Sequence, residues 1–285
     1  MTDIPEVIWS NTDYPYICLI DKKRTEAFRA AIKATVLPGN TVVEVGAGTG
    51  ILSLFAAAAG AQRVIAVEID PILARSLRQT VHDNDFEHII EVVEGDATVV
   101  DLPQDADVVI GELVETGLID EMQVAVMNKL REKGVIGTHT RLVPEAYETF
   151  CQLVYTDSTF YGYKIDAPKH DWPYYAKDKE EWTQLELEAV TDQQKLSHVD
   201  FCEGRIDPVV DKVVEFKIEP GKQATALRLS GIAHMTTDQR LGACNSFNGD
   251  KILSLPDKSY EGTVKLRFSY KMSEGMNSFH VSVAR

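Results

Sequence analysis

The sequence predicts an α/β protein in which a doubly wound, Rossmann-like parallel sheet is followed by an antiparallel β-barrel. In the first half, short runs of β-branched residues alternate with helical segments, which is typical of a parallel sheet covered by helices. After Pro144 the apolar residues alternate with a period of two, most clearly over 264–272, as they do in antiparallel strands. With 285 residues, the chain is long enough to form two cores. We therefore expect a first domain over residues 1–143 and a second over residues 144–285.

The predicted parallel sheet consists of short apolar strands joined by helices. β-Branched residues pack well on a pleated surface, and the expected strands cover residues 42–45, 64–67, 89–93, 107–110 and 135–139. Helices are expected over residues 21–35, over 51–59, after Asp70, and over 117–132. Asp70 is a suitable cap for its helix, and Pro71 suits the first helical position.

The second half carries the expected barrel strands and an insertion. The period-two segments are residues 214–218, 227–229, 264–272 and 279–283. Residues 156–197 are instead rich in aromatic and charged side chains, which predicts a projecting arm. An exposed aromatic segment is typical of an interaction surface, so we expect this arm to mediate a homodimer.

Composition narrows the class of protein and its partners. The net charge of −15 either repels nucleic acid and favours cationic partners, or is a general solubility trait. The four cysteines are scattered without metal-type spacing, so we expect reduced thiols, no metal and a cytoplasmic location. No apolar run approaches the roughly 20 residues that a membrane helix needs. The first five residues lack the basic start and apolar core of a signal peptide.

A glycine-rich loop directly follows the first predicted strand. Glycine occupies positions 46, 48 and 50, and Glu44 precedes them. Glycine lets a backbone turn tightly and approach a ligand with no Cβ in the way. A dinucleotide fingerprint would need glycine at position 51, where this chain has Ile51. The spacing of Gly46, Gly48 and Gly50 looks like the loop of S-adenosylmethionine-dependent methyltransferases, and an ordinary strand-to-helix turn is the alternative.

Four further residues suit the parts of S-adenosylmethionine. Glu68 ends the second strand, where a carboxylate can accept hydrogen bonds from ribose hydroxyls. Asp96, after the third strand, can accept the adenine amino group, with the amide of Ala97 facing the ring. Arg24 can hold the methionine carboxylate through two hydrogen bonds. The alternatives are a solvated strand-end acid, a turn-forming aspartate and an ordinary surface arginine.

Longer motifs extend the likeness. They are Asp21-x-x-Arg24-Thr25, VEVGAGTGILS over residues 43–53, Val67-Glu68, and GELVETGLIDE over residues 111–121. These segments resemble protein arginine methyltransferases, in which a loop after the fourth strand carries two glutamates nine positions apart, as Glu112 and Glu121 are here. The resemblance implies a barrel with a dimerisation arm, S-adenosylmethionine as cofactor, and catalytic roles for these two glutamates.

Two carboxylates suit methyl transfer to a nitrogen atom. The reaction is an in-line displacement at a sulfonium, so a nitrogen lone pair must point at the methyl carbon. Glu112 and Glu121 can hold a guanidinium or amine by its N–H groups, which orients the nitrogen and offsets its charge. One of them can accept the departing proton if burial raises its pKa. We expect Glu115, between them, to be solvated.

Three departures from the family pattern concern the substrate pocket. The family has Ser-Glu-Trp-Met-Gly around its first glutamate, where this chain has GELVE over residues 111–115. The family's Thr-His-Trp loop has no counterpart in 237–256; His234 is a candidate substitute, and a core or surface histidine is the alternative. Of the family's N-terminal Tyr-Phe-x-x-Tyr, only Tyr14 and Tyr16 are available to match.

The expected function is S-adenosylmethionine-dependent N-methylation of a protein arginine or another cationic nitrogen. One alternative is methylation of a small molecule or of RNA, although the absence of a basic stripe disfavours RNA. Another is a catalytically silent protein that binds the cofactor and acts through its arm. NAD-dependent oxidoreduction conflicts with the glycine spacing.

Overall fold

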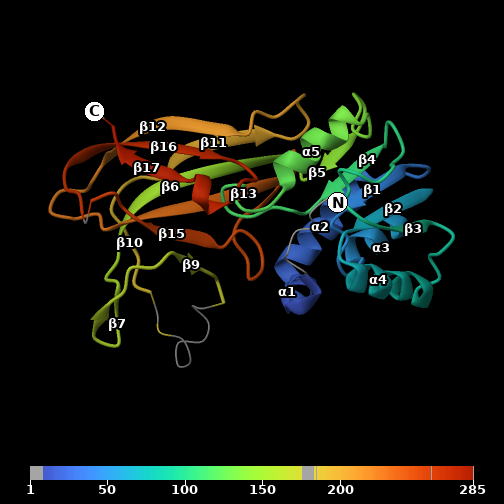
Figure 1. The fold of residues 1–285 in the computed structure, drawn as a ribbon, viewed down its shortest axis with the longest axis horizontal. Helices are drawn as coiled ribbons and strands as arrows, with labels where there is room; N and C mark the ends of the chain where they lie inside the picture. The colour runs from blue at the N-terminus through green and yellow to red at the C-terminus, as the bar shows by residue number, and fades with distance from the viewer. Residues whose placement is uncertain (1–8, 175–182, 184, 258, 285) are drawn as a thin grey trace.

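The fold has two halves, one built on a parallel sheet and one on antiparallel sheets. The computed structural model describes residues 9–174, 183, 185–257 and 259–284. Figure 1 shows the two halves side by side, with α1 (Tyr14–Ile20) and α2 (Lys22–Thr35) between them. The side-chain amide of Gln239, from the second half, donates to the Ala27 carbonyl of α2 at 2.9 Å. The first long helix is therefore shared by both halves.

The parallel sheet has five strands in the order β3-β2-β1-β4-β5. The strands are β1 (Thr41–Val45), β2 (Arg63–Glu68), β3 (Ile90–Glu94), β4 (Val108–Gly111) and β5 (Arg141–Val143). The central strand β1 pairs with both β2 and β4, so the chain direction across the sheet reverses beside it. In such sheets, ligands bind in the crevice outside the carboxyl ends of the strands at this reversal.

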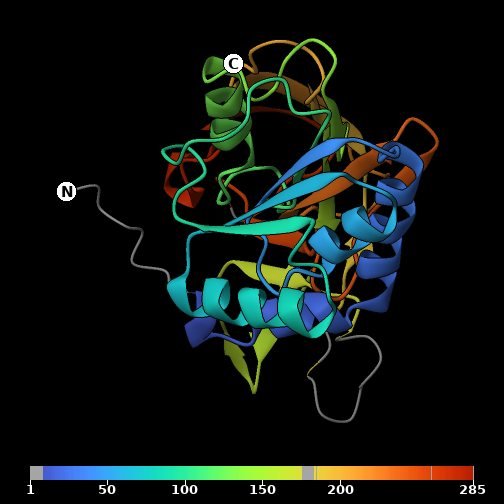
Figure 2. The same cartoon turned by 90° about the vertical axis from the view of Figure 1, so that its right-hand side faces the viewer.

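Helices cover both faces of the parallel sheet. They are α3 (Ile51–Ala58), α4 (Pro71–Asp83) and α5 (Gln123–Glu132), preceded in the chain by α1, α2 and the short η1 (Trp9–Asn11). Figures 1 and 2 show α5 on one side of the sheet and α4 on the other. Asp70 caps α4 through the Ile72 and Leu73 amides, with Pro71 at the first position, as the sequence predicts.

The second half consists of antiparallel sheets. A seven-stranded sheet contains β6 (Ala146–Tyr155), β9 (Lys169–Asp171), β10 (Glu188–Ala189), β11 (Gln194–Asp200), β13 (Ala226–Thr236), β14 (Gln239–Leu241) and β15 (Asp250–Ser254). A three-stranded sheet contains β12 (Val209–Lys217), β16 (Thr263–Lys271) and β17 (His280–Val283), the last preceded by η2 (Met276–Ser278). Along β16, alternate residues are buried, because one face of the sheet packs on the core. The predicted fold class is confirmed.

Two elements of the first half differ from the prediction. The helix expected over 117–132 begins only at Gln123, because Gly117 (φ 92°) and Leu118 (φ 56°) are left-handed and break the helical path. The strand expected over 135–139 is absent, and β5 lies later. Val135 instead ends α5: its amide donates to the Leu130 carbonyl at 2.9 Å, the pattern of a Schellman motif with glycine before it.

The expected arm is smaller than residues 156–197. Strands β9, β10 and β11 of this segment join the seven-stranded sheet, and β11 buries Leu196 and Val199 in the core. Among the described residues of this segment, β7 (Thr159–Phe160) and β8 (Tyr163–Lys164) form a separate hairpin, which projects from the body in Figure 1. Tyr175 and Trp182, counted in the prediction, lie outside the described residues.

Among the described residues, no helix has the length and apolar character required to cross a bilayer.

Candidate active site

A cavity of about 140 Å³ lies at the carboxyl edge of the parallel sheet, at the reversal beside β1. Its walls come from α1, α2, the glycine loop and the ends of β2 and β4. Seven of the residues predicted from the sequence line it, namely Arg24, Glu44, Gly46, Gly48, Glu68, Glu112 and Glu121. The fold therefore brings together residues that span nearly 100 positions of the chain.

The three glycines of the loop have different neighbours, although all have positive φ (70°, 54° and 82°). A Cβ on Gly46 would lie 2.7 Å from Leu113, and one on Gly50 would lie 2.1 Å from Leu77. These two glycines are required for packing. A Cβ on Gly48 would meet only the Gly46 carbonyl, at 4.0 Å. Gly48 therefore faces the open space of the cavity, where a ligand can approach the backbone.

Glu68 connects β2 to the glycine loop. It is 3% exposed; one carboxylate oxygen accepts the Gly48 amide at 2.7 Å and the other accepts the Asp70 amide at 2.8 Å. Burial raises its pKa despite these bonds. A carboxylate has about four acceptor positions, so Glu68 can still accept ligand hydroxyls.

Glu44 lies within β1 at the floor of the cavity. It is buried, and its carboxyl group is bonded to the Ser53 hydroxyl of α3. Burial raises its pKa to about 8. This contact attaches the helix after the glycine loop to the strand before it.

Arg24 is the cation of the site. It lies in the first turn of α2 and is 5% exposed; Nη2 forms an ion pair with Glu112, and Nη1 donates to the Cys18 carbonyl at 3.2 Å. Its buried Nε has no hydrogen-bond partner among the described residues. A buried donor without a partner is unfavourable, so Arg24 has capacity for an anionic ligand group.

Glu112 and Glu121 line the same cavity from opposite ends of one loop. Glu112 directly follows β4; burial raises its pKa, and the Arg24 guanidinium acts against this rise. Burial and then the charges of Glu112 and Glu115 raise the pKa of Glu121. Glu121 makes no hydrogen bond or ion pair with another residue in the part of the chain that the structure describes. It is therefore the carboxyl group that is free to take a cation.

Four of the predicted or candidate residues lie outside this cavity. Gly50 is the N-cap of α3 and lies against the Leu77 side chain. Asp96 and Ala97 are not part of the cavity wall. Asp96 follows β3 at the same sheet edge and accepts the Thr98 amide at 2.8 Å. His234 contacts Glu148 at 2.9 Å on the barrel, away from the cavity. Asp96 and Ala97 stay predictions for the adenine subsite.

The structure also assigns contacts that sequence reasoning missed. Of the two tyrosines, only Tyr14 lines the cavity, and its hydroxyl donates to the Ser246 carbonyl at 3.1 Å, whereas Tyr16 is exposed. Asp21 caps α2 and also accepts the Ser246 amide at 2.7 Å. The motif around Asp21 was visible in the sequence. Its partner, more than 200 residues away, carried no local signal.

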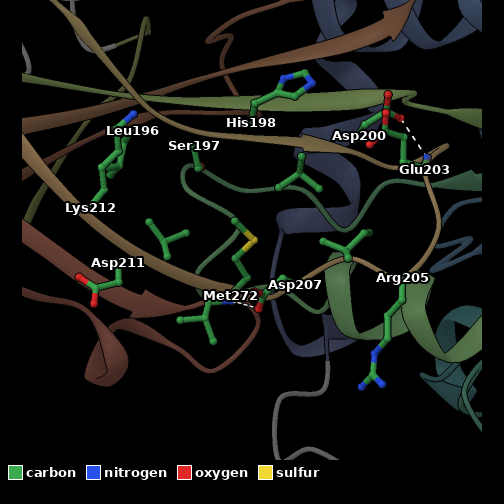
Figure 3. Close-up of a pocket in the computed structure, with 14 residues that line it drawn as sticks. Leu196, Ser197, His198, Asp200, Glu203, Arg205, Asp207, Asp211, Lys212 and Met272 are labelled. Atoms are coloured by element: carbon green, nitrogen blue, oxygen red, sulfur yellow. Dashed lines mark hydrogen bonds between the residues drawn. The ribbon is translucent and has the colours of Figure 1, made fainter.

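A second and larger cavity, of about 430 Å³, lies in the barrel half between β11 and β12 (Figure 3). It contains none of the predicted site residues. Three of its four acidic side chains have partners: Asp200 accepts the Cys202 amide, Asp207 accepts the Val209 amide, and Asp211 pairs with Arg267. The smaller cavity is therefore the candidate active site.

A glycine loop at the switch point, a strand-end carboxylate and a buried arginine define a class I S-adenosylmethionine-dependent methyltransferase. The residues fit this cofactor: Gly48 leaves room for it, and the free Nε of Arg24 can meet its carboxylate. A family model described as the TRM5/TYW2 methyltransferase domain matches residues 17–156.

Known proteins narrow the class further. The chain is 29% identical over 269 residues to an uncharacterized protein of Methanocaldococcus jannaschii, covering 94% of this chain and 95% of that one. It is 30% identical over 146 residues to an arginine N(omega)-methyltransferase of Streptomyces achromogenes, covering 50% of this chain and 40% of that one. The chain thus spans less than half of this relative.

Solved structures share the fold. In a Trypanosoma brucei PRMT1 enzyme–prozyme heterotetrameric complex with AdoHcy, the matched chain has a TM-score of 0.70 at 19% identity, with 91% of this chain and 89% of that chain covered. This likeness shows the methyltransferase sheet followed by a barrel. The chain is an S-adenosylmethionine-dependent methyltransferase similar to protein arginine methyltransferases.

Proposed function

We propose that the protein is an N-methyltransferase acting on a protein arginine or another cationic nitrogen. The observation that carries the proposal is the convergence of Glu112 and Glu121 on one cavity beside Arg24. Glu112 has an ion-pair partner in Arg24, whereas Glu121 has none among the described residues, so the two buried carboxyl groups favour a second cation between them. A neutral or anionic substrate would leave Glu121 without a partner.

Each residue of the cavity has a stated role in the proposal. Arg24 binds the carboxylate of the cofactor, and Glu68 binds its ribose. Gly48 and the residues next to it leave room for the cofactor to lie against the backbone of the loop. Bound S-adenosylmethionine supplies an electrophilic methyl group on a sulfonium. Glu112 and Glu121 then hold the N–H groups of the substrate and orient its lone pair. Because burial raises the pKa of Glu121, this carboxylate is a suitable acceptor for the proton that the nitrogen loses.

A free amino acid or small amine is the second candidate substrate. The relative from Streptomyces achromogenes is named an arginine N(omega)-methyltransferase, so its name supports a guanidinium without specifying a protein. The same two carboxylates would hold either form of the side chain. The two candidates differ in whether the cationic group belongs to a peptide or to a free small molecule.

We also propose a homodimer in which the arm of one protomer contacts the methyltransferase half of the other. Three side chains on or beside the β7–β8 hairpin, Tyr161, Tyr163 and Ile165, are exposed, the first by 88%. Tyr16 and Ile20 are exposed on α1. In a dimer with twofold symmetry, the apolar surface on the arm of each protomer can pack against the apolar surface on α1 of the other, so both surfaces are buried twice. Light scattering at micromolar concentration tests this against the monomer mass of 31.7 kDa.

The domain boundary and the location remain proposals. We propose that residues 1–143 bind the cofactor and that residues 144–285 shape the substrate side. The cysteines Cys18, Cys151, Cys202 and Cys244 are free, which supports a reducing, cytoplasmic location.

Methyl-labelled S-adenosylmethionine tests the proposed function. The protein is incubated separately with arginine-containing peptides, free arginine, polyamines and RNA. Label in a peptide or amine, lost with Glu121→Gln, is the expected result. Label only in RNA would contradict the cationic substrate. Tight cofactor binding with no transfer to any acceptor would favour the catalytically silent alternative.

A further inference from the structure

Lys251 is a buried lysine whose position the proposed reaction does not explain. It lies on β15 of the barrel half and is 3% exposed. Its ammonium group pairs with Glu115 and, at 2.6 Å, with Asp120. Both partners belong to the loop that carries Glu112 and Glu121, so one barrel side chain holds two acids of the catalytic loop.

Glu115 is correspondingly not the solvated residue that the sequence suggested. Its side chain is mostly buried, and burial raises its pKa while the Lys251 ammonium acts against this rise. One of its oxygens accepts the Ile119 amide and, at 2.9 Å, the Asp120 amide. Glu115 therefore ties the two halves of the loop together just before Glu121.

The loop needs such support because its backbone is strained. Leu118 has φ 56°, a left-handed conformation that is unfavourable for a residue with a Cβ. Such residues persist where the surroundings fix them.

The barrel half supplies much of this support. Thr116 donates to the Gly249 carbonyl at 2.8 Å, and three barrel amides bond to the loop, namely Ser273 to the Leu118 carbonyl, Gly275 to the Ile119 carbonyl and Met276 to Asp120. Lys251 adds the buried charge to these contacts.

We propose that Lys251 is a positioning residue that fixes Glu121 against Glu112 through Glu115 and Asp120. By pairing with these two acids, it also confines the unpaired negative charge of the loop to Glu121. The inference rests on the proposed function for its effect on turnover, but its effect on the loop is independent of any substrate. The barrel half then contributes to catalysis through the shape and charge of a loop in the other half.

The charges that face Glu121 make a specific pH signature. Glu112 and Glu115 raise its pKa, whereas Arg24 and Lys251 lower it. Loss of Lys251 removes one lowering charge and leaves Glu115 unpaired, so both effects raise the pKa of Glu121 further. The acid limb of the kcat profile should move to higher pH. A purely structural role would reduce the amount of folded protein without moving this limb.

The experiment compares Lys251→Met with Lys251→Arg and with the matched control Lys265→Met, a half-exposed barrel lysine that pairs with Glu215 at 3.3 Å. Hydrogen exchange of the Ile119 and Asp120 amides is measured on the free protein, and kcat is measured against pH. In Lys251→Met we expect amide protection to fall at least about tenfold and the acid limb to rise by about one pH unit. In Lys251→Arg and Lys265→Met, the amide protection and the position of the acid limb should stay near the wild-type values.

Adding Glu115→Gln to Lys251→Met should recover part of the pH shift, because it removes the unpaired buried charge. Unchanged amide protection in Lys251→Met would overturn the proposal, as would an equal loss in Lys265→Met. If Lys251→Met does not fold, Lys251→Gln takes its place and must show the same loss of amide protection and the same shift of the acid limb. If wild type methylates no acceptor, the proposed function fails while the exchange measurement still decides the role of Lys251.

Discussion

Arg24 and Glu112 form a buried ion pair in the wall of the cavity at the sheet edge, from the first turn of α2 to the end of β4. The sequence assigned these residues to different ligands, the cofactor carboxylate and the substrate nitrogen. In the structure each is the other's partner. Cofactor binding to Arg24 would therefore weaken its hold on Glu112, which prepares this carboxylate for a cationic substrate.

This pair predicts an order of binding. Substrate should bind weakly until the cofactor carboxylate has occupied Arg24, since Glu112 is neutralised before then. Calorimetric titration of an accepted peptide should give at least about tenfold tighter binding with S-adenosylhomocysteine present, a coupling of about 1.4 kcal/mol. Equal affinity with and without it would contradict the order.

Replacing either of the two glutamates that we propose to be catalytic should lower turnover and leave cofactor binding unchanged. Glu112→Gln and Glu121→Gln should each lower kcat at least about a hundredfold, as loss of a positioned acid–base or electrostatic group does. Their combined loss should be less than additive, because both act on one nitrogen. The control is Glu91→Gln, at an exposed position that pairs with Arg63. A Glu112→Gln variant with wild-type turnover would remove this residue from the mechanism.

A side chain at position 48 should abolish cofactor binding. Gly48→Val places methyl groups in the open space of the cavity and also strains a residue with φ 54°. Gly204→Val is the matched control, since Gly204 has open space around it and no left-handed backbone. Calorimetry with S-adenosylhomocysteine should find no binding for the first variant and wild-type affinity for the second.

Glu68→Ala should weaken the cofactor without abolishing it. The substitution removes acceptors for the ribose and also leaves the Gly48 amide without its partner. The expected loss is about 1–3 kcal/mol, the cost of leaving a buried hydrogen-bonding group without its partner. Titration compares it with Glu68→Gln, which keeps one acceptor and should lose less. Wild-type affinity in Glu68→Ala would refute the ribose role.

The buried Glu44 should make stability depend on pH. Its pKa is about 8 in the folded protein against 4.5 for the unperturbed group, so the folded chain keeps a proton that the unfolded chain has lost. This contribution to stability is complete below pH 4.5 and is lost as pH rises to about 8, with a slope of about 1.4 kcal/mol per pH unit for one proton. Urea unfolding from pH 5.5 to 7.5 should show a flatter dependence in Glu44→Gln than in wild type. Identical slopes would contradict the raised pKa.

The sequence by itself determined the architecture of the sheet and the cofactor loop. These features are local: Gly46, Gly48 and Gly50 act on adjacent backbone, Asp70 and Pro71 start the next helix, and the period-two pattern indicates antiparallel strands. The prediction was less accurate for the conformation of the loop that carries Glu121. The residues after Gly117 have a helical pattern, but contacts with the barrel hold them in another conformation. Val135 was assigned to a strand because its role in ending α5 depends on a hydrogen bond to Leu130.

Only the tertiary structure decided which charges meet. Arg24 pairs with Glu112 across 88 positions, Asp21 bonds to Ser246 across 225, and Lys251 pairs with Glu115 across 136. A sequence shows that such groups exist, but burial sets which pairs form, because a buried charge without a partner is far more costly than one in water. Glu115 looked solvated for this reason: its partner lies on a strand of the other half, and only the packing of the two halves brings Lys251 to it.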